Sequence, residues 1–286
     1  MLREEQIKLK SKKYSKFAVN SLIIEPTVWP RFGLVGLNDD GTHNDMNYSM
    51  MCKSAKSLQI FFEECFLLGC YFNYSINLTQ NKDFFLMWQS RYFHAIKEML
   101  NHTNGVNTHK GIAYLIGLFV FVQGLFQCND ISHILNYAHR ISIFHTTDII
   151  RSSQSSFSET YGMWAYHKYG VLGIREHIID NFSLVKRAWL WCLQSKSIPS
   201  SIKYSILRIF FLAVLQDTNI IKRGGYSTAC NIKKHAHHIL KCQNLKVIKD
   251  KASELEDFFI EHKLSAGATG DMIAVMLYFE FVYNDK

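Results

Sequence analysis

Hydrophobic residues recur along most of this chain at the three- and four-residue spacing of a helix face, and strand-like alternation is scarce. The chain has only three prolines in 286 residues, so few positions break a helix. We therefore predict an all-α fold. The pattern predicts helices from the start to about residue 24, at 48–68, 84–100, 108–126, after a cap at 130, and at 159–168, 183–193, 202–215, 228–241, 252–262 and 269–283.

Polar segments separate these predicted helices. Pro26 and Pro30 predict an extended stretch that leads into a glycine-rich loop at 31–44, and a Ser-rich loop is expected at 145–158. No internal repeat or linker is visible. We predict one all-helical domain over residues 1–286, a multi-helix bundle in which polar loops converge on one site. Residues 1–16 form a basic N-terminal segment that we interpret as a solvated helix face.

Charge and cysteine usage narrow the class of partner. The formal net charge of +8 suits an anionic partner, but no Lys/Arg run with interleaved aromatic residues indicates nucleic-acid binding. Seven scattered cysteines without a CxxC pair, and a charged start without a secretory signal, favour a cytoplasmic protein with reduced thiols. The apolar run at 112–126 is short and holds Gly117, Gln123 and Gly124. It predicts a core helix and no membrane span.

The first chemical motif is the loop that holds Asp39, Asp40, His43, Asn44 and Asp45. Carboxylates at this density repel one another, so they need a cation, hydrogen-bond donors or a functional reason to stay close. A Mg²⁺ ion that also bridges phosphates would satisfy them. The alternative is turn and capping chemistry, because Asp, Asn and Gly all favour turns.

Two further motifs precede apolar helices. At 107–111 (NTHKG), helix N-terminal amides and Lys110 would make a phosphate seat to which His109 adds a donor, or Thr108 merely caps an ordinary helix. At 170–176, Arg175 would clamp a phosphate with Glu176 orienting it, or the two form a surface ion pair.

The last two motifs lie in the final third of the chain. Residues 217–225 place Lys222 and Arg223 beside Gly224 and Gly225, which suits an anion, although a helix C-terminus has the same features. Residues 265–271 are small and lead into the final helix, as a ligand-approach loop or as a Ser/Thr-capped helix entry. The histidines at 235, 237 and 238 lack a nearby acidic or thiol partner and are interpreted as a solvated face.

In this order and spacing, the five motifs resemble the triphosphoribosyl-dephospho-coenzyme A synthase family. The family's PGLV, NNGAHxDM, NTHKG, GxxGxRxEA, DTN with RGG, and SPGGSAD patterns match residues 32–35, 39–46, 107–111, 170–176, 217–225 and 265–271. Phe32 stands where the family has Pro, His177 where it has Ala, and the last loop reads SAGATGD. The resemblance covers nearly the whole chain and implies an all-helical enzyme.

The resemblance implies transfer of triphosphoribose from ATP to the ribose 2′-hydroxyl of 3′-dephospho-coenzyme A, with release of adenine. The product would be the prosthetic-group precursor for the acyl carrier protein of citrate lyase or malonate decarboxylase. The competing hypotheses are a nucleotide N-glycohydrolase, a non-catalytic nucleotide-binding protein and a helical nucleic-acid-binding protein. The assigned residues are Asp45, His43 and Asp40 for catalysis; His109, Lys110, Arg175, Asn219, Arg223, Gly224 and Gly225 for nucleotide and phosphate; and Asp45, Asp217 and Asp271 for Mg²⁺.

Overall fold

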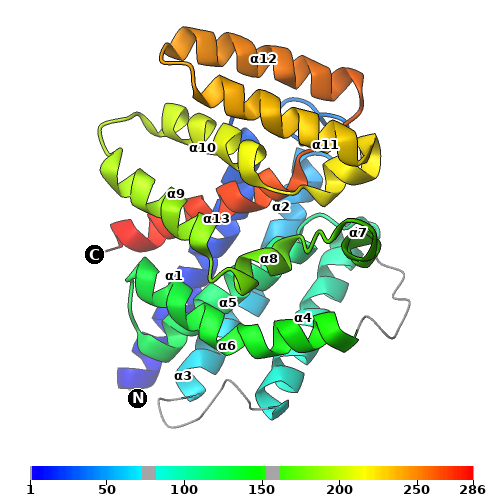
Figure 1. Cartoon of the computed structure of the whole chain (residues 1–286). Helices are drawn as coiled ribbons and strands as arrows, with labels where there is room; N and C mark the ends of the chain where they lie inside the picture. Colours follow the sequence, from blue (N-terminus) through cyan, green and yellow to red (C-terminus); the bar gives the residue numbers. More distant parts are fainter. Residues whose placement is uncertain (1, 73–81, 153–160, 286) are drawn as a thin grey trace.

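The computed structural model describes residues 2–72, 82–152 and 161–285, and within these ranges every regular element is a helix and none is a strand. The predicted all-α class is confirmed (Figure 1). The elements are α1 (Leu2–Ile24), the 3₁₀ turn η1 (Glu25–Thr27), α2 (Tyr48–Ser57), α3 (Gln59–Tyr71), α4 (Lys82–His102), α5 (Lys110–Phe126), α6 (Ile131–Ser152), α7 (Tyr161–Tyr169), α8 (Ile174–Ile179), α9 (Ser183–Gln194), α10 (Ser200–Val214), α11 (Thr218–Leu240), α12 (Leu245–Glu261) and α13 (Gly267–Asn284).

Several predicted boundaries are wrong. Helix α11 begins at Thr218 rather than at 228, and α12 begins at Leu245 rather than at 252. The single helix expected at 48–68 is two helices that meet at the buried Leu58. There, a hydrogen bond from the Leu58 N–H to the carbonyl three residues earlier, Ala55 O (3.3 Å), ends α2. The loop expected from 145 is helical as far as Ser152, and residues 153–158 lie outside the described part of the chain. Packing overrides local polarity in α6, where Thr147 donates back to Ile143 O (3.0 Å) within the helix.

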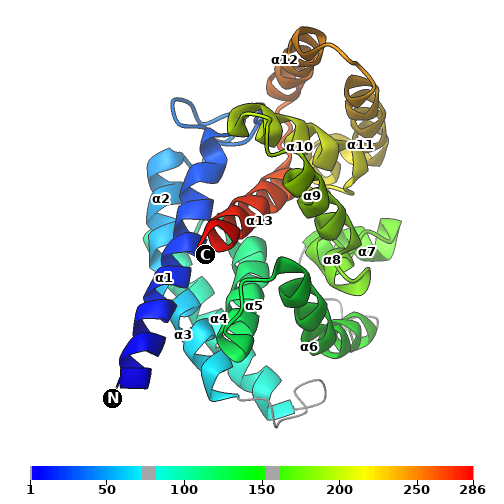
Figure 2. The ribbon, with the colours of Figure 1, turned by 90° about the vertical axis from the view of Figure 1, so that its left-hand side faces the viewer.

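The core consists of two hydrophobic clusters. The larger one surrounds α5 and α13, and α1, α3 and α9 pack against them; Figure 2 shows α13 crossing the centre of the molecule. Helix α5 is buried on nearly every side from Ile112 to Leu125, which confirms the predicted core helix. Gly124 is needed there, because a side chain would collide with the backbone of Phe66 on α3. Among the described residues, no single helix is long and apolar enough to cross a membrane. Two bent pairs, α5 with the first part of α6 and α10 with α11, reach that length and apolar composition only when the two helices are taken together.

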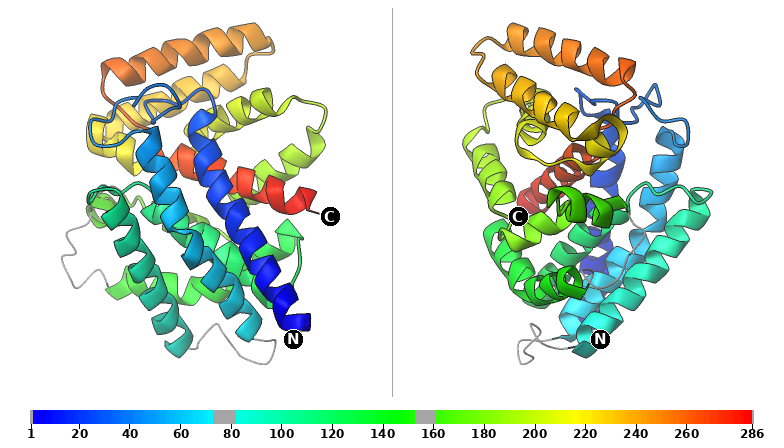
Figure 3. Two further views of the ribbon diagram at one scale, coloured as in Figure 1. Left: turned by 180° about the vertical axis from the view of Figure 1, so that it is seen from behind. Right: turned by 45° about the vertical axis from the view of Figure 1, so that its right-hand side comes forward.

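The smaller cluster joins α10, α11 and α12 with Phe32 and Leu264, at the end of the molecule opposite α3 and α6 (Figures 1 and 3). Helix α11 bends at Gly225 (φ 83°), as the paired glycines predicted. The N-terminus of α13 reaches this second cluster. The polar residues at the start of α13 therefore lie where the two clusters meet. The single-domain organisation stays a prediction.

Candidate active site

Residues 263–271 run from the end of the α12–α13 connection into the first turn of α13 and contact three of the other motifs; we call this segment the final loop. Its contacts begin with the carbonyl of Lys263 and end with the carboxylate of Asp271. They reach the loop at 31–45, Gly111 of the second motif, and Asp217, Asn219 and Arg223 of the fourth motif. The third motif borders the second, because Ile174 lies beside Gly111. The predicted convergence of polar segments is therefore observed, and the last motif lies at its centre.

The first motif is anchored to the final loop by Thr42, whose hydroxyl donates to Leu264 O (2.7 Å) and lies 3.0 Å from Gly33 O. Within this motif, Asp39 belongs to the loop itself, because it pairs with Arg31 at 2.7 Å. Although partial burial acts to raise the pKa of Asp39, the hydrogen bond from Arg31 and the amide of Gly41 hold it below its usual value. The turn interpretation is therefore correct for Asp39.

Asp40 and Asp45 in the same loop are exposed, and they leave their carboxylates available to a ligand. Asp40 contributes its backbone carbonyl to the turn, accepting from the His43 N–H at 3.1 Å. Asp45 lies 3.5 Å from Nδ1 of His43 with its side chain 60% exposed.

His43 connects three segments. Its Nε2 lies 2.9 Å from Ser265 Oγ, and its Nδ1 lies 3.2 Å from Nη2 of Arg223. A guanidinium only donates, so Nδ1 accepts from Arg223 and Nε2 carries the proton that it donates to Ser265. Burial lowers the pKa of His43, and the charge of Arg223 lowers it further, although Asp45 opposes this. The imidazole is therefore neutral at neutral pH and is able to take up a proton.

Arg223 lies on α11, where its guanidinium faces the first motif and the final loop. Nη1 donates to Thr42 Oγ1 (2.8 Å), Thr42 O (3.2 Å) and Lys263 O (3.1 Å). The side chain remains exposed, so it holds two segments together while presenting positive charge to solvent. Of the neighbouring glycines, Gly224 allows close approach to Leu264, and Gly225 makes the bend in α11.

Asp217 caps two helices at once. Its Oδ1 accepts from the amides of Asn219 (2.8 Å) and Ile220 (3.3 Å) at the start of α11, and its Oδ2 accepts from the amide of Ala268 (2.8 Å) at the start of α13. Burial raises the pKa of Asp217 to about 6, and the amides oppose this shift. The fourth motif therefore begins as a helix start at Asp217, and the short first segment of α11 ends at the bend at Gly225, so it holds features of both interpretations.

The second motif places its residues on two sides of the start of α5. His109 is buried with Nδ1 2.7 Å from Ser54 Oγ, and burial lowers its pKa to about 4, so it is neutral and lies behind the helix start. This placement argues against the predicted phosphate contact of His109. Lys110 is exposed, and its amide donates to the Asn107 side chain (3.3 Å). The N-cap residue is His109, which makes no capping bond; Asn107, two residues before His109, bonds the first helical amide, and the Thr108 hydroxyl bonds Ser54 (2.5 Å).

Asp271 lies beside the second motif, which in turn borders the third. A side chain built on Gly111 would lie 3.7 Å from Oδ2 of Asp271 and 3.4 Å from Ile174, the residue before Arg175. Burial, together with the nearby carboxylates of Asp217 and Glu25, raises the pKa of Asp271 well above its usual range. Burial raises the pKa values of Tyr92 and Tyr114, and the nearby charge of Arg175 opposes both shifts.

Four participants were not predicted from the sequence: Glu25, Arg208, Tyr92 and Tyr114. Arg208 is fully buried on α10 and donates from Nη2 to the Oε1 (2.5 Å) and backbone O (3.1 Å) of Glu25. Its Nε and Nη1 have no hydrogen-bond partner among the described residues. Glu25 in turn lies beneath Gly270, so this buried cation lies below the start of α13. A lone Arg in an apolar helix was the available signal.

Comparison with known proteins identifies the family. The sequence model of the CitG family, described as ATP:dephospho-CoA triphosphoribosyl transferase, matches residues 11–285. The chain belongs to this family. The resemblance carried by the five motifs is confirmed, and with it the class of transferase that the motifs implied.

Relatives of the CitG family align over most of the chain. The 2-(5''-triphosphoribosyl)-3'-dephosphocoenzyme-A synthase of Haemophilus ducreyi is 27% identical, and the alignment covers 94% of this chain and 88% of that protein. A probable synthase of the same name from Streptococcus equi subsp. zooepidemicus is 26% identical over 94% of this chain and 96% of its own length. Protein CitXG of Haemophilus influenzae is 26% identical, and the alignment covers 91% of this chain but 58% of that protein. No solved structure matches the chain.

Phe32, which replaces the proline expected from the CitG pattern, has a structural explanation. Its φ of 52° is closed to proline, and its N–H donates to Glu256 (3.1 Å), a bond that proline lacks the hydrogen to make. The ring is fully buried against Phe259, and the Phe32 carbonyl accepts from Ala266 N (3.1 Å) in the final loop. Phe32, although it differs from the family pattern, therefore helps to hold the final loop in place.

The three carboxylates assigned to Mg²⁺ do not form a ligand set. Asp45 is largely exposed beside His43, and both oxygens of Asp217 already accept from backbone amides. Only Asp217 and Asp271 are coupled electrostatically. Throughout 2–72, 82–152 and 161–285, no three His, Cys, Asp or Glu side chains are placed to hold a metal ion. These residues therefore do not fit a preformed metal site.

Proposed function

We propose that the chain transfers the triphosphoribosyl group of ATP to the ribose 2′-hydroxyl of 3′-dephospho-coenzyme A and releases adenine. Family membership supports this activity. The observation that carries it to particular residues is the final loop, which contacts motifs from three other parts of the chain. From the same family membership, we propose that the product is the prosthetic-group precursor for the acyl carrier protein of citrate lyase or malonate decarboxylase.

The reaction requires three kinds of group at the site: a carboxylate, a base and cations. Cleavage of the bond from ribose C1′ to adenine develops positive charge on the sugar, which a nearby carboxylate stabilises. The 2′-hydroxyl must lose a proton as it attacks. The triphosphate needs cations, and Lys110, Arg175 and Arg223 would supply them. A single displacement at C1′ would invert its configuration.

We assign proton transfer to His43 and Asp45. His43 is neutral, and its acceptor Nδ1 is bonded to Arg223 beside Asp45. When the Arg223 guanidinium turns to the triphosphate, the Nδ1 lone pair is released and would take the proton of the hydroxyl. After protonation, the Nδ1–H would face the Asp45 carboxylate, which stabilises the imidazolium. Asp40 is the second candidate base, because it is exposed in the same loop.

Mg²⁺ and cellular location stay predictions. Mg²⁺ is commonly bound through one or two carboxylates together with substrate phosphates, so we expect it to arrive with ATP rather than to occupy a site of its own. We place the protein in the cytoplasm because its seven cysteines are all free thiols.

The test is to incubate the purified protein with ATP, Mg²⁺ and 3′-dephospho-coenzyme A and to measure free adenine and the mass of the adduct. Adenine that forms only with the acceptor, together with the adduct, supports the transferase. Adenine without acceptor would identify an N-glycohydrolase instead, and nucleotide binding without any adenine would identify a non-catalytic binding protein. Asp45→Asn should abolish most turnover while leaving unfolding unchanged, because the side chain is exposed.

A further inference from the structure

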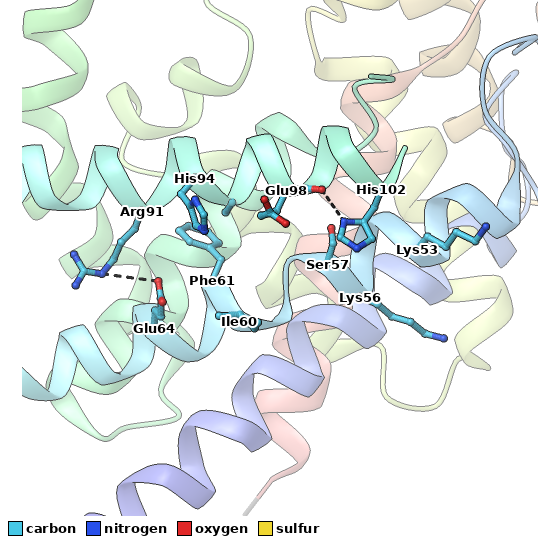
Figure 4. A pocket seen from close by; sticks show the side chains of 11 residues that line it. Lys53, Lys56, Ser57, Ile60, Phe61, Glu64, Arg91, His94, Glu98 and His102 are labelled. Atoms are coloured by element: carbon cyan, nitrogen blue, oxygen red, sulfur yellow. Dashed lines mark hydrogen bonds and ion pairs between the residues drawn. The ribbon is translucent and has the colours of Figure 1, made fainter. Parts of the chain in front are cut away.

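A groove runs between α2, α3 and α4, on a face of the molecule that the sequence motifs do not occupy (Figure 4). Its volume is about 540 Å³, which lies within the range of small-molecule sites. Helix α4 contributes lining residues from Arg91 to His102, so the groove extends for about 16 Å along that helix. It is therefore long enough for an elongated ligand.

The two ends of the groove differ in charge. Lys53, Lys56, Glu98 and His102 lie at one end, where two lysines outnumber one carboxylate, and neither lysine forms an ion pair within the described part of the chain (Figure 4). At the other end, Arg91 is neutralised by Glu64 at 3.9 Å. The groove thus has a cationic end and an electrically balanced end.

Apolar side chains lie between these ends. Ile60 is 70% exposed on α3, and Phe61 and Ala95 line the groove beside it. The groove therefore offers a cation cluster followed by an apolar surface.

The cationic end adjoins the second motif. Ser54, next to Lys53 on α2, bonds Thr108 (2.5 Å) and His109 (2.7 Å). On α4, Tyr92 follows Arg91 in sequence and donates to Lys110 O (2.8 Å). The helices that form the groove walls therefore also hold the start of α5, which places the cationic end of the groove next to the second motif.

We propose that this groove binds the diphosphate and pantetheine arm of 3′-dephospho-coenzyme A; this rests on the proposed function. In that molecule the ribose that accepts the new bond carries the diphosphate, and the uncharged arm follows. The diphosphate matches Lys53, Lys56 and His102 beside the second motif. The arm, with its amides and geminal methyl groups, matches the apolar surface at Ile60 and the balanced Arg91–Glu64 end.

Binding calorimetry on the full chain tests the placement. The donor site is first saturated with 9-deaza-ATP, whose carbon–carbon glycosidic bond prevents reaction, and 3′-dephospho-coenzyme A or ADP is then titrated. ADP has the same adenosine diphosphate but no arm. Lys53→Glu/Lys56→Glu should weaken both ligands by about tenfold or more, the effect of losing a charge-assisted contact. Ile60→Asp should weaken 3′-dephospho-coenzyme A by a similar factor and leave ADP unchanged.

Matched controls separate local effects from general ones. Lys246→Glu/Lys249→Glu makes the same charge change at the same spacing on exposed positions of α12, and Leu190→Asp alters a side chain that is 56% exposed on α9. Both should bind like the wild type. Unchanged binding in the Lys53/Lys56 variant overturns the proposal, and so does an Ile60 variant that weakens both ligands or neither. If the expected pattern holds but the wild type releases no adenine, the proposed function fails while the groove assignment stands.

Discussion

The final loop and the α2–α4 groove place polar side chains in opposite ways. Around the final loop, Asp217, His43 and Arg223 bond to other parts of the protein as well as facing a site. In the groove, Lys53 and Lys56 extend from helix surfaces into solvent. Polar groups near the final loop therefore combine folding with function, whereas we expect the two groove lysines to vary without disturbing the fold. Substitutions should separate the two regions by how much stability each change costs.

The largest expected effect is at the buried pair beneath α13. Arg208→Met leaves Glu25 as an uncompensated buried charge and should lower the free energy of unfolding by about 3–5 kcal/mol. Urea denaturation measures this. The double variant Glu25→Gln/Arg208→Met should recover part of the loss, because no charge is left without a partner. A single variant as stable as the wild type would contradict the buried pairing.

Asp217→Ala should come next. It removes bonds to the starts of two helices, so we expect a loss of about 2–4 kcal/mol in the free energy of unfolding. Asp130→Ala is the matched control, because Asp130 caps only α6, at an exposed position, and should lose about 1 kcal/mol. Equal losses in the two variants would show that the bridge to Ala268 adds nothing.

The pH dependence of stability sharpens the same point. The pKa of Asp217 rises from 3.8 to about 6 on folding, so the folded state holds the proton more tightly. Its stabilising contribution is fully present below about pH 4 and is lost as the pH rises through about 6. Relative to Asp217→Asn, the wild type should therefore lose about 1–3 kcal/mol between about pH 4 and pH 7. A difference that does not change with pH would refute the shift.

Arg223→Ala should change protonation more than folding. Burial, the main cause of the lowered pKa of His43, stays in the variant. The positive charge of Arg223, which lowers that pKa further, is removed, so the pKa of His43 should rise. NMR titration of His43 measures the change, and the pH profile of adenine release should move with it. Arg187→Ala, an exposed change on α9, is the control. A His43 titration that stays at its wild-type position would disprove the contact.

The smallest effect on stability is expected in the groove. Lys53→Glu/Lys56→Glu changes exposed positions without ion-pair partners among the described residues, so the free energy of unfolding should stay within about 0.5 kcal/mol of the wild type. Urea denaturation alongside the Asp217 variants gives the comparison directly. A loss as large as that of Asp217→Ala would show that the groove, too, belongs to the fold.

Local sequence information predicted helices well where apolar residues repeat at helical spacing, as in α1, α5 and α10. It failed where packing decided the outcome. Leu58 ends one helix and precedes another although the pattern runs through it, and α6 extends through polar residues as far as Ser152. The six-residue α8 was missed because it is too short to show a period.

The candidate site shows the same division. The motifs indicated which segments carry chemistry, and Asp45, Lys110 and Arg175 remain candidates for catalysis or phosphate binding. Roles within the motifs were less predictable, because a sequence shows neither burial nor partner. His109 lies in the core behind the phosphate seat, and Asp217 caps a helix that starts 50 residues later in the chain, at Gly267.

By itself, the sequence determined the helical class, the family and the five polar segments, since residue spacing and motif order are properties of the chain. Only the tertiary structure decided that the final loop contacts three of the other segments, that Glu25 and Arg208 lie beneath it, and that a groove with one cationic end adjoins the second motif. Hydrogen bonds and buried charges depend on distances between residues far apart in the chain, and those distances exist only after helices pack.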